Sequence, residues 1–183
     1  PFCILDDCST DKTIVWLKKN KINFTKNREN LGYEKNLLKG IKKFKNYCDY
    51  LITFDGDGQH TFTDLKRVIK TKKSFDIIVC NRKKKNRFME EIISFISNLL
   101  FGLRDPVSGF KVYKTSILKK KNFDKVGNFF LADFLLSFIK SKKIINFDIT
   151  TKARIDKPKV GGFVGLNLKE IRILLKIFKI KMI

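Results

Sequence analysis

Short apolar runs alternate with amphipathic segments along the first half of the chain. Strands are expected where the runs are largely apolar, at residues 2–6, 22–25, 49–55 and 75–81. Helices are expected at 11–20, at 33–44 and from Thr61, which has capping-box spacing to Asp64. Strands separated by helices predict an α/β fold with a mostly parallel sheet that is covered by helices on both faces.

Polar side chains follow three of the predicted strands, where ligands of such sheets bind. Asp6 and Asp7 lie at the end of the first strand, Asp55 and Asp57 lie at the end of the third, and Arg82 follows the fourth. If the backbone stays extended from Asp55 to Asp57, both carboxylates point to one side, repel each other and favour a divalent ion. Oxygen ligands suit Mg²⁺ or Mn²⁺. A surface turn is the alternative interpretation, and the longer calcium-loop pattern is absent.

The composition limits the kind of protein and its partners. A chain of 183 residues with 43% hydrophobic content can bury the core of one domain. The formal net charge of +22 favours an anionic partner, although biased residue usage would give the same excess of lysine. Zinc-finger spacing, aromatic RNA-binding motifs and helix-turn-helix signatures are absent, so a nucleic-acid-binding module is the weaker alternative.

The cysteines and the longest apolar stretches bear on localisation. None of the 4 cysteines forms a CxxC pair, which is typical of reduced thiols in the cytosol. The longest apolar stretches are too short or too charged to span a bilayer. We therefore expect a cytoplasmic protein, free or peripheral on the cytoplasmic face of a membrane. Because residues 2–6 read as an interior strand, we also expect a missing N-terminal segment.

Four motifs occur in an order and spacing that point to a known family: "ILDDCSTDKT", "DYLITFDGDGQHTFTDL", "DPVSGFKVYK" and "ARIDKPKVGG". With them the chain resembles the family 2 glycosyltransferases, particularly the dolichol- and polyprenol-phosphate sugar transferases. The resemblance implies a GT-A fold, in which a Rossmann-like sheet binds a nucleotide-diphosphate sugar. It covers residues 1–183 as a single catalytic domain that lacks the family's first strand.

The resemblance also implies roles for the acidic residues. Asp6 and Asp7 match the pair that contacts the base and ribose of the nucleotide. Asp55 and Asp57 match the metal-binding DxD motif, and Gln59 matches a further metal-site position. A metal held by Asp57 and Asp55 would stabilise the leaving phosphate as a Lewis acid, which makes Asp57 a candidate catalytic residue.

Basic residues of the motifs match positions that bind phosphate in the family. Arg82 matches a residue near the donor phosphates, while Arg154 and Lys159 resemble a late basic pair that holds phosphate groups. Cys8 stands where the family usually has glycine, a departure that is expected to alter the turn without removing the carboxylates.

The acceptor side is implied by two further segments. Asp105, Ser108 and Gly109 fall in a motif that shapes the acceptor site, and Asp133 stands where many members carry an acid near the acceptor. A polyprenyl or dolichyl phosphate is already an anion at neutral pH and needs no general base. A sugar hydroxyl in cell-surface polysaccharide synthesis would need one, for which Asp133 is the candidate. A catalytically inactive module is a further alternative.

A basic amphipathic helix is predicted at the end of the chain, over residues 167–183. Its basic stripe comprises Lys169, Arg172, Lys176 and Lys179, and its apolar stripe Leu168, Ile171, Leu175 and Phe178. The pattern is typical of a helix at the surface of an anionic membrane. It is equally typical of a helix that packs on the core and leaves a basic face in water.

Overall fold

The computed structural model describes residues 2–71, 74–85, 87–120, 123, 130–152 and 168–182. Within its helices the description leaves out the side chains of Phe130, Leu131, Asp133, Leu168 and Lys169.

Strands and helices alternate in the first half of the chain, as predicted. The order begins with β1 (Ile4–Asp6), α1 (Thr13–Lys19), β2 (Phe24–Lys26), α2 (Tyr33–Phe44), β3 (Tyr50–Thr53), α3 (Phe62–Ile69) and β4 (Ile77–Arg82). It continues with α4 (Phe88–Phe101), β5 (Lys111–Lys114), α5 (Thr115–Lys119), α6 (Phe130–Leu136), β6 (Ile144–Ile149) and α7 (Leu168–Met182).

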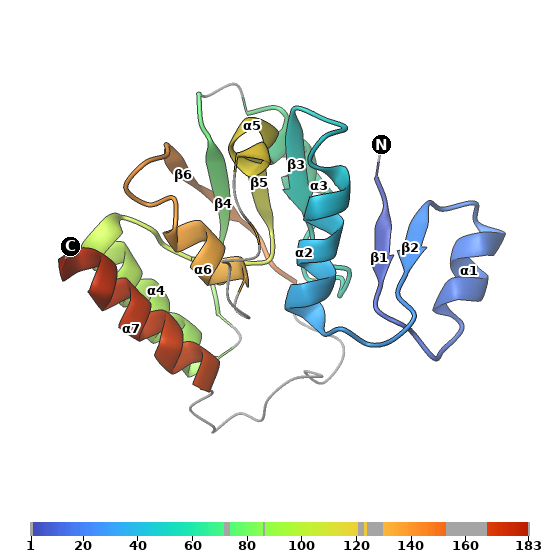
Figure 1. Cartoon of the computed structure of the whole chain (residues 1–183), viewed down its shortest axis with the longest axis horizontal. Coiled ribbons are helices and arrows are strands. Elements are labelled where there is room, and N and C mark those ends of the chain that lie inside the picture. The colour runs from blue at the N-terminus through green and yellow to red at the C-terminus, as the bar shows by residue number, and fades with distance from the viewer. Residues whose placement is uncertain are drawn as a thin grey trace.

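The described strands form two separate sheets (Figure 1). β1 pairs in parallel with β2, and the larger sheet has the order β3-β5-β4-β6. β4 and β6 are parallel, and β5 runs antiparallel to both β3 and β4. Since β3, β4 and β6 therefore run in the same direction, the predicted mostly parallel sheet is confirmed, with β5 as its antiparallel strand.

The direction of β5 follows from how the chain leaves α4. Gly102 ends α4 in the left-handed conformation, with φ 65°. The following loop returns to the edge where β4 ends, because the Arg82 backbone N–H donates to the Asp105 carboxylate at 3.1 Å. β5 therefore starts at the carboxyl end of β4 and runs the opposite way.

Both faces of the larger sheet are buried. Ile77 and Val79 of β4 face a core that includes residues of α2 and of α4 to α7. Ile78 and Cys80 face the other way, onto Val68 of α3. The expected burial on both faces is thus confirmed, and it explains why β4 is continuously apolar.

The predicted start of α3 is confirmed, and its capping residues also connect α3 to the end of β6. The Thr61 hydroxyl accepts from the Asp64 backbone N–H at 3.1 Å and donates to the Asp64 carboxylate at 2.8 Å. The same carboxylate accepts from Arg67 at 2.6 Å and from the Thr150 backbone N–H at 2.9 Å. This cap fixes the end of the loop that carries the two DxD carboxylates.

The predicted C-terminal helix exists as α7 and packs beside α4 (Figure 1). Ile173 and Ile177 face the core, whereas Leu175 and Phe178 of the predicted apolar stripe are exposed. The core-facing stripe is therefore a different one from the stripe read in the sequence. In the described part of the chain no helix has both the length and the apolar content to cross a bilayer.

Candidate active site

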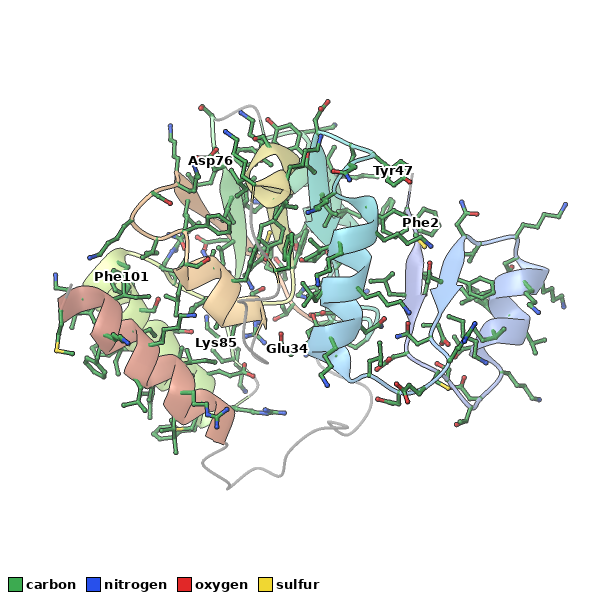
Figure 2. The ribbon with its side chains drawn as sticks, viewed as in Figure 1. Phe2, Glu34, Tyr47, Asp76, Lys85 and Phe101 are labelled. Atoms are coloured by element: carbon green, nitrogen blue, oxygen red, sulfur yellow. The ribbon has the colours of Figure 1, made fainter. Side chains whose placement is uncertain are left out.

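The edge of the sheet where β3 and β4 end gathers most of the described candidate residues. Glu34, at the start of α2, and Lys85, after β4, mark this end of the molecule, and Asp76 and Tyr47 mark the opposite end (Figure 2).

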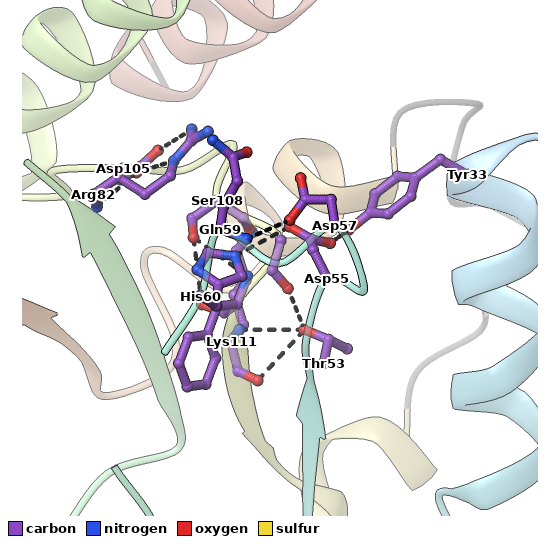
Figure 3. Close-up of polar contacts among 12 residues, drawn as sticks. Tyr33, Thr53, Asp55, Asp57, Gln59, His60, Arg82, Asp105, Ser108 and Lys111 are labelled. Carbon is purple, nitrogen blue, oxygen red and sulfur yellow. Dashed lines mark hydrogen bonds and ion pairs between the residues drawn. The ribbon is translucent and has the colours of Figure 1, made fainter. Parts of the chain in front are cut away.

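Two side chains hold Asp55 at this edge, and each contacts a different oxygen of its carboxylate (Figure 3). The Tyr33 hydroxyl donates to its Oδ1, and His60 Nε2 lies 3.2 Å from its Oδ2. Burial alone would raise the pKa of Asp55, but the hydrogen bonds from His60 and Tyr33 outweigh it and lower that pKa. Asp55 is therefore a preorganised carboxylate whose orientation is set by the protein.

A glycine makes room for this carboxylate. The Thr53 hydroxyl donates to the Gly109 carbonyl at 2.7 Å, which holds the loop before β5 against the end of β3. A methyl group at Gly109 would overlap both oxygens of Asp55 and the Tyr33 hydroxyl. Gly109, which belongs to the predicted acceptor motif, thus leaves the space that the Asp55 carboxylate occupies.

Asp57 is exposed, in contrast to Asp55. Its Oδ1 accepts from the Gln59 backbone N–H at 3.1 Å, across a bend in which Gly58 has φ 77°. The backbone is bent from Gly56 to Gly58, so the expected extended geometry is wrong. Even so, the two carboxylates lie at the same end of β3 (Figure 3).

These residues suit a hard cation that keeps most of its own ligands. In the described ranges no three His, Cys, Asp or Glu side chains form a metal-binding group. Mg²⁺ and Mn²⁺ commonly take one or two carboxylates and complete their shell with water and substrate phosphates. Asp57 offers an accessible carboxylate and Asp55 an oriented one, which fits such an ion.

The first acidic pair closes the loops that flank the smaller sheet. Asp6 is buried and accepts from the Ser9 backbone N–H at 3.1 Å. Asp7 accepts from Asn27 Nδ2 at 2.8 Å and from the backbone N–H groups of Leu31 at 2.9 Å and Gly32 at 2.8 Å. Asp7 therefore orders the loop that leads into α2 and hence to Tyr33.

Arg82 lies in a buried ion-pair cluster at the end of β4. Its Nε is 2.9 Å from Asp105 Oδ2, and its Nη2 is 3.1 Å from Asp105 Oδ1 and 3.0 Å from Glu90 Oε2. Burial would raise the pKa of Asp105, but the Arg82 charge lowers it. Much of the Arg82 charge is thus directed to protein carboxylates, and its predicted contact with donor phosphates stays a prediction.

The structure leaves the side chains of three sequence candidates undescribed. Arg154 and Lys159 fall in 153–167, and for Asp133 only the backbone, in α6, is described. Ser108 is buried, and its carbonyl accepts from Lys111 Nζ.

Tyr33, His60 and Lys111 lie at this edge of the sheet but were not predicted from the sequence. His60 lies three residues after Asp57, and this nearness in the sequence is the signal that points to it. Tyr33 lies far from Asp55 in the sequence and carries no comparable signal. Burial lowers the pKa of Lys111 to about 8, although its sequence position gives no hint that this lysine is buried.

Comparisons with known proteins identify the family of this chain. The family model described as "Glycosyl transferase family 2" matches residues 2–134. An uncharacterized protein of Methanocaldococcus jannaschii is 31% identical over 143 residues, which are 66% of this chain and 62% of the relative. The chain thus spans less than two thirds of that relative's length.

Solved structures share the fold at low sequence identity. Glucosyl-3-phosphoglycerate synthase from Mycobacterium tuberculosis in complex with phosphoglyceric acid superposes with a TM-score of 0.70 at 14% identity, covering 99% of this chain and 69% of that one. Its complex with Mn²⁺, uridine diphosphate and phosphoglyceric acid gives 0.69 at 13% identity, covering 99% and 67%. The family match includes β1 to β5 and both acidic motifs, so the chain belongs to glycosyl transferase family 2.

Proposed function

We propose that this glycosyltransferase moves a sugar, with inversion, from a nucleotide-diphosphate sugar to a polyprenyl phosphate at a membrane surface. The observation that carries the proposal is the arrangement of the two DxD carboxylates. Asp55 is locked by Tyr33 and His60, and Asp57 lies beside it in water, at the carboxyl edge where donors bind.

Different residues would bind different parts of the donor. Asp57 and Asp55 would hold Mg²⁺ or Mn²⁺, which supplies Lewis-acid stabilisation of the leaving diphosphate when bound. Because Asp55 is already oriented, little reorganisation is needed when the donor arrives. Asp7 and its hydrogen-bonded loop would form the nucleoside side of the site, and Gln59 would complete the metal side.

The acceptor chemistry follows from the charges near the site. A phosphate monoester is a nucleophilic anion at neutral pH, so its attack on the sugar carbon needs no base. Arg154 and Lys159 are the candidates to hold the phosphate groups. The structural neighbours bind phosphoglyceric acid, a ligand that also bears a phosphate group. A hydroxyl acceptor would instead require Asp133 as the base.

The proposal is tested by product analysis with a panel of nucleotide sugars and Mn²⁺. Polyprenyl phosphate in detergent, phosphoglyceric acid and a free sugar are offered as separate acceptors. A glycosyl phosphodiester formed only with polyprenyl phosphate supports the proposal. Transfer to phosphoglyceric acid or to the sugar hydroxyl alone would reject the lipid acceptor and keep the glycosyltransferase.

A further inference from the structure

The paired helices α4 and α7 expose large apolar side chains on their outer surfaces. Each helix uses another stripe for the core: Ile93 and Ser97 are buried on α4, and Ile173 and Ile177 on α7. The exposed set, here called the apolar ridge, comprises Phe88, Phe95, Leu99, Leu175, Phe178 and Met182. These side chains are between 48% and 81% exposed, which is unusual for so many large apolar groups on neighbouring helices.

The spacing shows that each helix carries a stripe and not scattered residues. Phe88, Phe95 and Leu99 are separated by seven and four positions, and Leu175, Phe178 and Met182 by three and four. Residues at such spacings share one side of a helix. The two helices start side by side, since Arg87 Nη1 lies 3.8 Å from Glu170 Oε1.

Positive charge accompanies the ridge. Lys179 and Lys181 are exposed on α7, and Lys83 and Lys84 are exposed just before α4. Exposed apolar side chains with lysines at their margin suit the interface of an anionic bilayer, where rings enter the headgroup region and lysines meet lipid phosphates. The exposed acid Glu91 of α4 works against such binding and provides a test.

The ridge also begins at the candidate active site. Glu90, in the first turn of α4, lies 3.0 Å from Arg82 at the end of β4. Phe88 is two residues away along the chain. A surface that holds this end of α4 against a bilayer would bring the catalytic edge to the headgroups.

We infer that the apolar ridge of α4 and α7, with its lysine margin, is a docking surface for an anionic lipid bilayer. The biological role of this surface rests on the proposed function, because a lipid-borne acceptor lies in that bilayer. The inference assigns the contact to the apolar side chains of both helices together with lysines such as Lys179 and Lys181, and not to the basic stripe of α7 alone.

Vesicle flotation of the full chain tests the surface. Vesicles of phosphatidylcholine alone are compared with vesicles of phosphatidylcholine and phosphatidylglycerol in equal parts. We expect the wild type to float with the anionic vesicles. The double variant Phe95→Ser/Phe178→Ser should lose about tenfold or more of this partition, and so should Lys179→Gln/Lys181→Gln. Glu91→Lys should increase it.

Matched variants control for general effects of charge and polarity. Val15→Ser/Ile69→Ser changes exposed apolar residues of α1 and α3, and Lys18→Gln/Lys19→Gln changes exposed lysines of α1. Both should float like the wild type. Equal losses in these controls, or no flotation of the wild type, would overturn the inference.

Two further measurements separate the possible failures. If sedimentation shows a dimer that the ridge variants convert to monomers, while no form binds vesicles, the ridge is an interface between copies and the inference is wrong. Nucleotide binding in solution is measured in parallel. Vesicle binding without transfer to polyprenyl phosphate would reject the proposed acceptor and keep the docking surface.

Discussion

The two carboxylates of the DxD motif differ in how much they contribute to the stability of the fold. Asp55 accepts from Tyr33 and faces His60, so its loss leaves two polar groups without their partner, whereas Asp57 is in water. We predict that Asp55→Ala lowers the free energy of unfolding by about 1–3 kcal/mol, and that Asp57→Ala lowers it by less, because Asp57 is exposed and loses only the hydrogen bond from the Gln59 backbone N–H. Urea denaturation measures both. Equal stability of the two variants would contradict the assigned hydrogen bonds.

Gly109 gives a second test of how Asp55 is seated. Gly109→Ala should displace the Asp55 carboxylate, cost about 1–3 kcal/mol of stability and abolish metal-dependent donor binding, because the new methyl group overlaps the carboxylate. Gly56→Ala is the matched control, since the space beside Gly56 is open and its φ is not positive. Normal donor binding by Gly109→Ala would show that the seat is adaptable.

Among the elements, β4, the loop before β5 and α4 are joined by the Arg82 cluster. Asp105 is fully buried and its pKa is lowered in the folded state, so its contribution to stability is present above its unfolded pKa of about 3.9. That contribution is lost as the pH falls through the lower folded pKa. Asp105→Asn should cost about 3 kcal/mol or more at pH 7.

The pH dependence of unfolding separates this effect from a simple packing defect. The wild type should lose stability steeply as the pH falls below about 4, and Asp105→Asn should show a flatter acid limb. Parallel curves for the two proteins would mean that the Asp105 carboxylate is not the titrating group.

The turn between β1 and α1 carries a strained residue. Cys8 has φ 64°, in the left-handed region. Glycine adopts this region without a steric penalty, whereas a residue with a Cβ atom is strained there. Cys8→Gly should therefore raise the free energy of unfolding by about 0.5–1 kcal/mol. Cys8→Ala keeps the Cβ atom and should bring no gain. An equal gain from both variants would mean that the thiol, and not the backbone, is the source of the strain.

For the molecule as a whole, the alternation of strands and helices could be predicted because β4 and α2 have clear periodicities. The family could be recognised because its motifs lie at strand ends, where chemistry constrains the residue types. The antiparallel β5 could not be predicted, since its direction depends on a long-range bond between Arg82 and Asp105.

The candidate site was predictable only in its local part. Asp55 and Asp57 are close in the sequence, but Tyr33 reaches Asp55 from α2 through the tertiary fold. In α7 the sequence offers two apolar stripes, and only packing against α4 and α6 decides that Ile173 and Ile177 turn inward.

The central claim is that Asp57, beside a fixed Asp55, holds a metal that binds the donor diphosphate. The most direct test is calorimetric titration of uridine diphosphate and other nucleoside diphosphates into the wild type and Asp57→Ala, with and without Mn²⁺. We predict Mn²⁺-dependent binding of a nucleoside diphosphate by the wild type and loss of the Mn²⁺ dependence in Asp57→Ala, which still unfolds cooperatively. Binding that needs no Mn²⁺, or that Asp57→Ala retains in full, would contradict the claim.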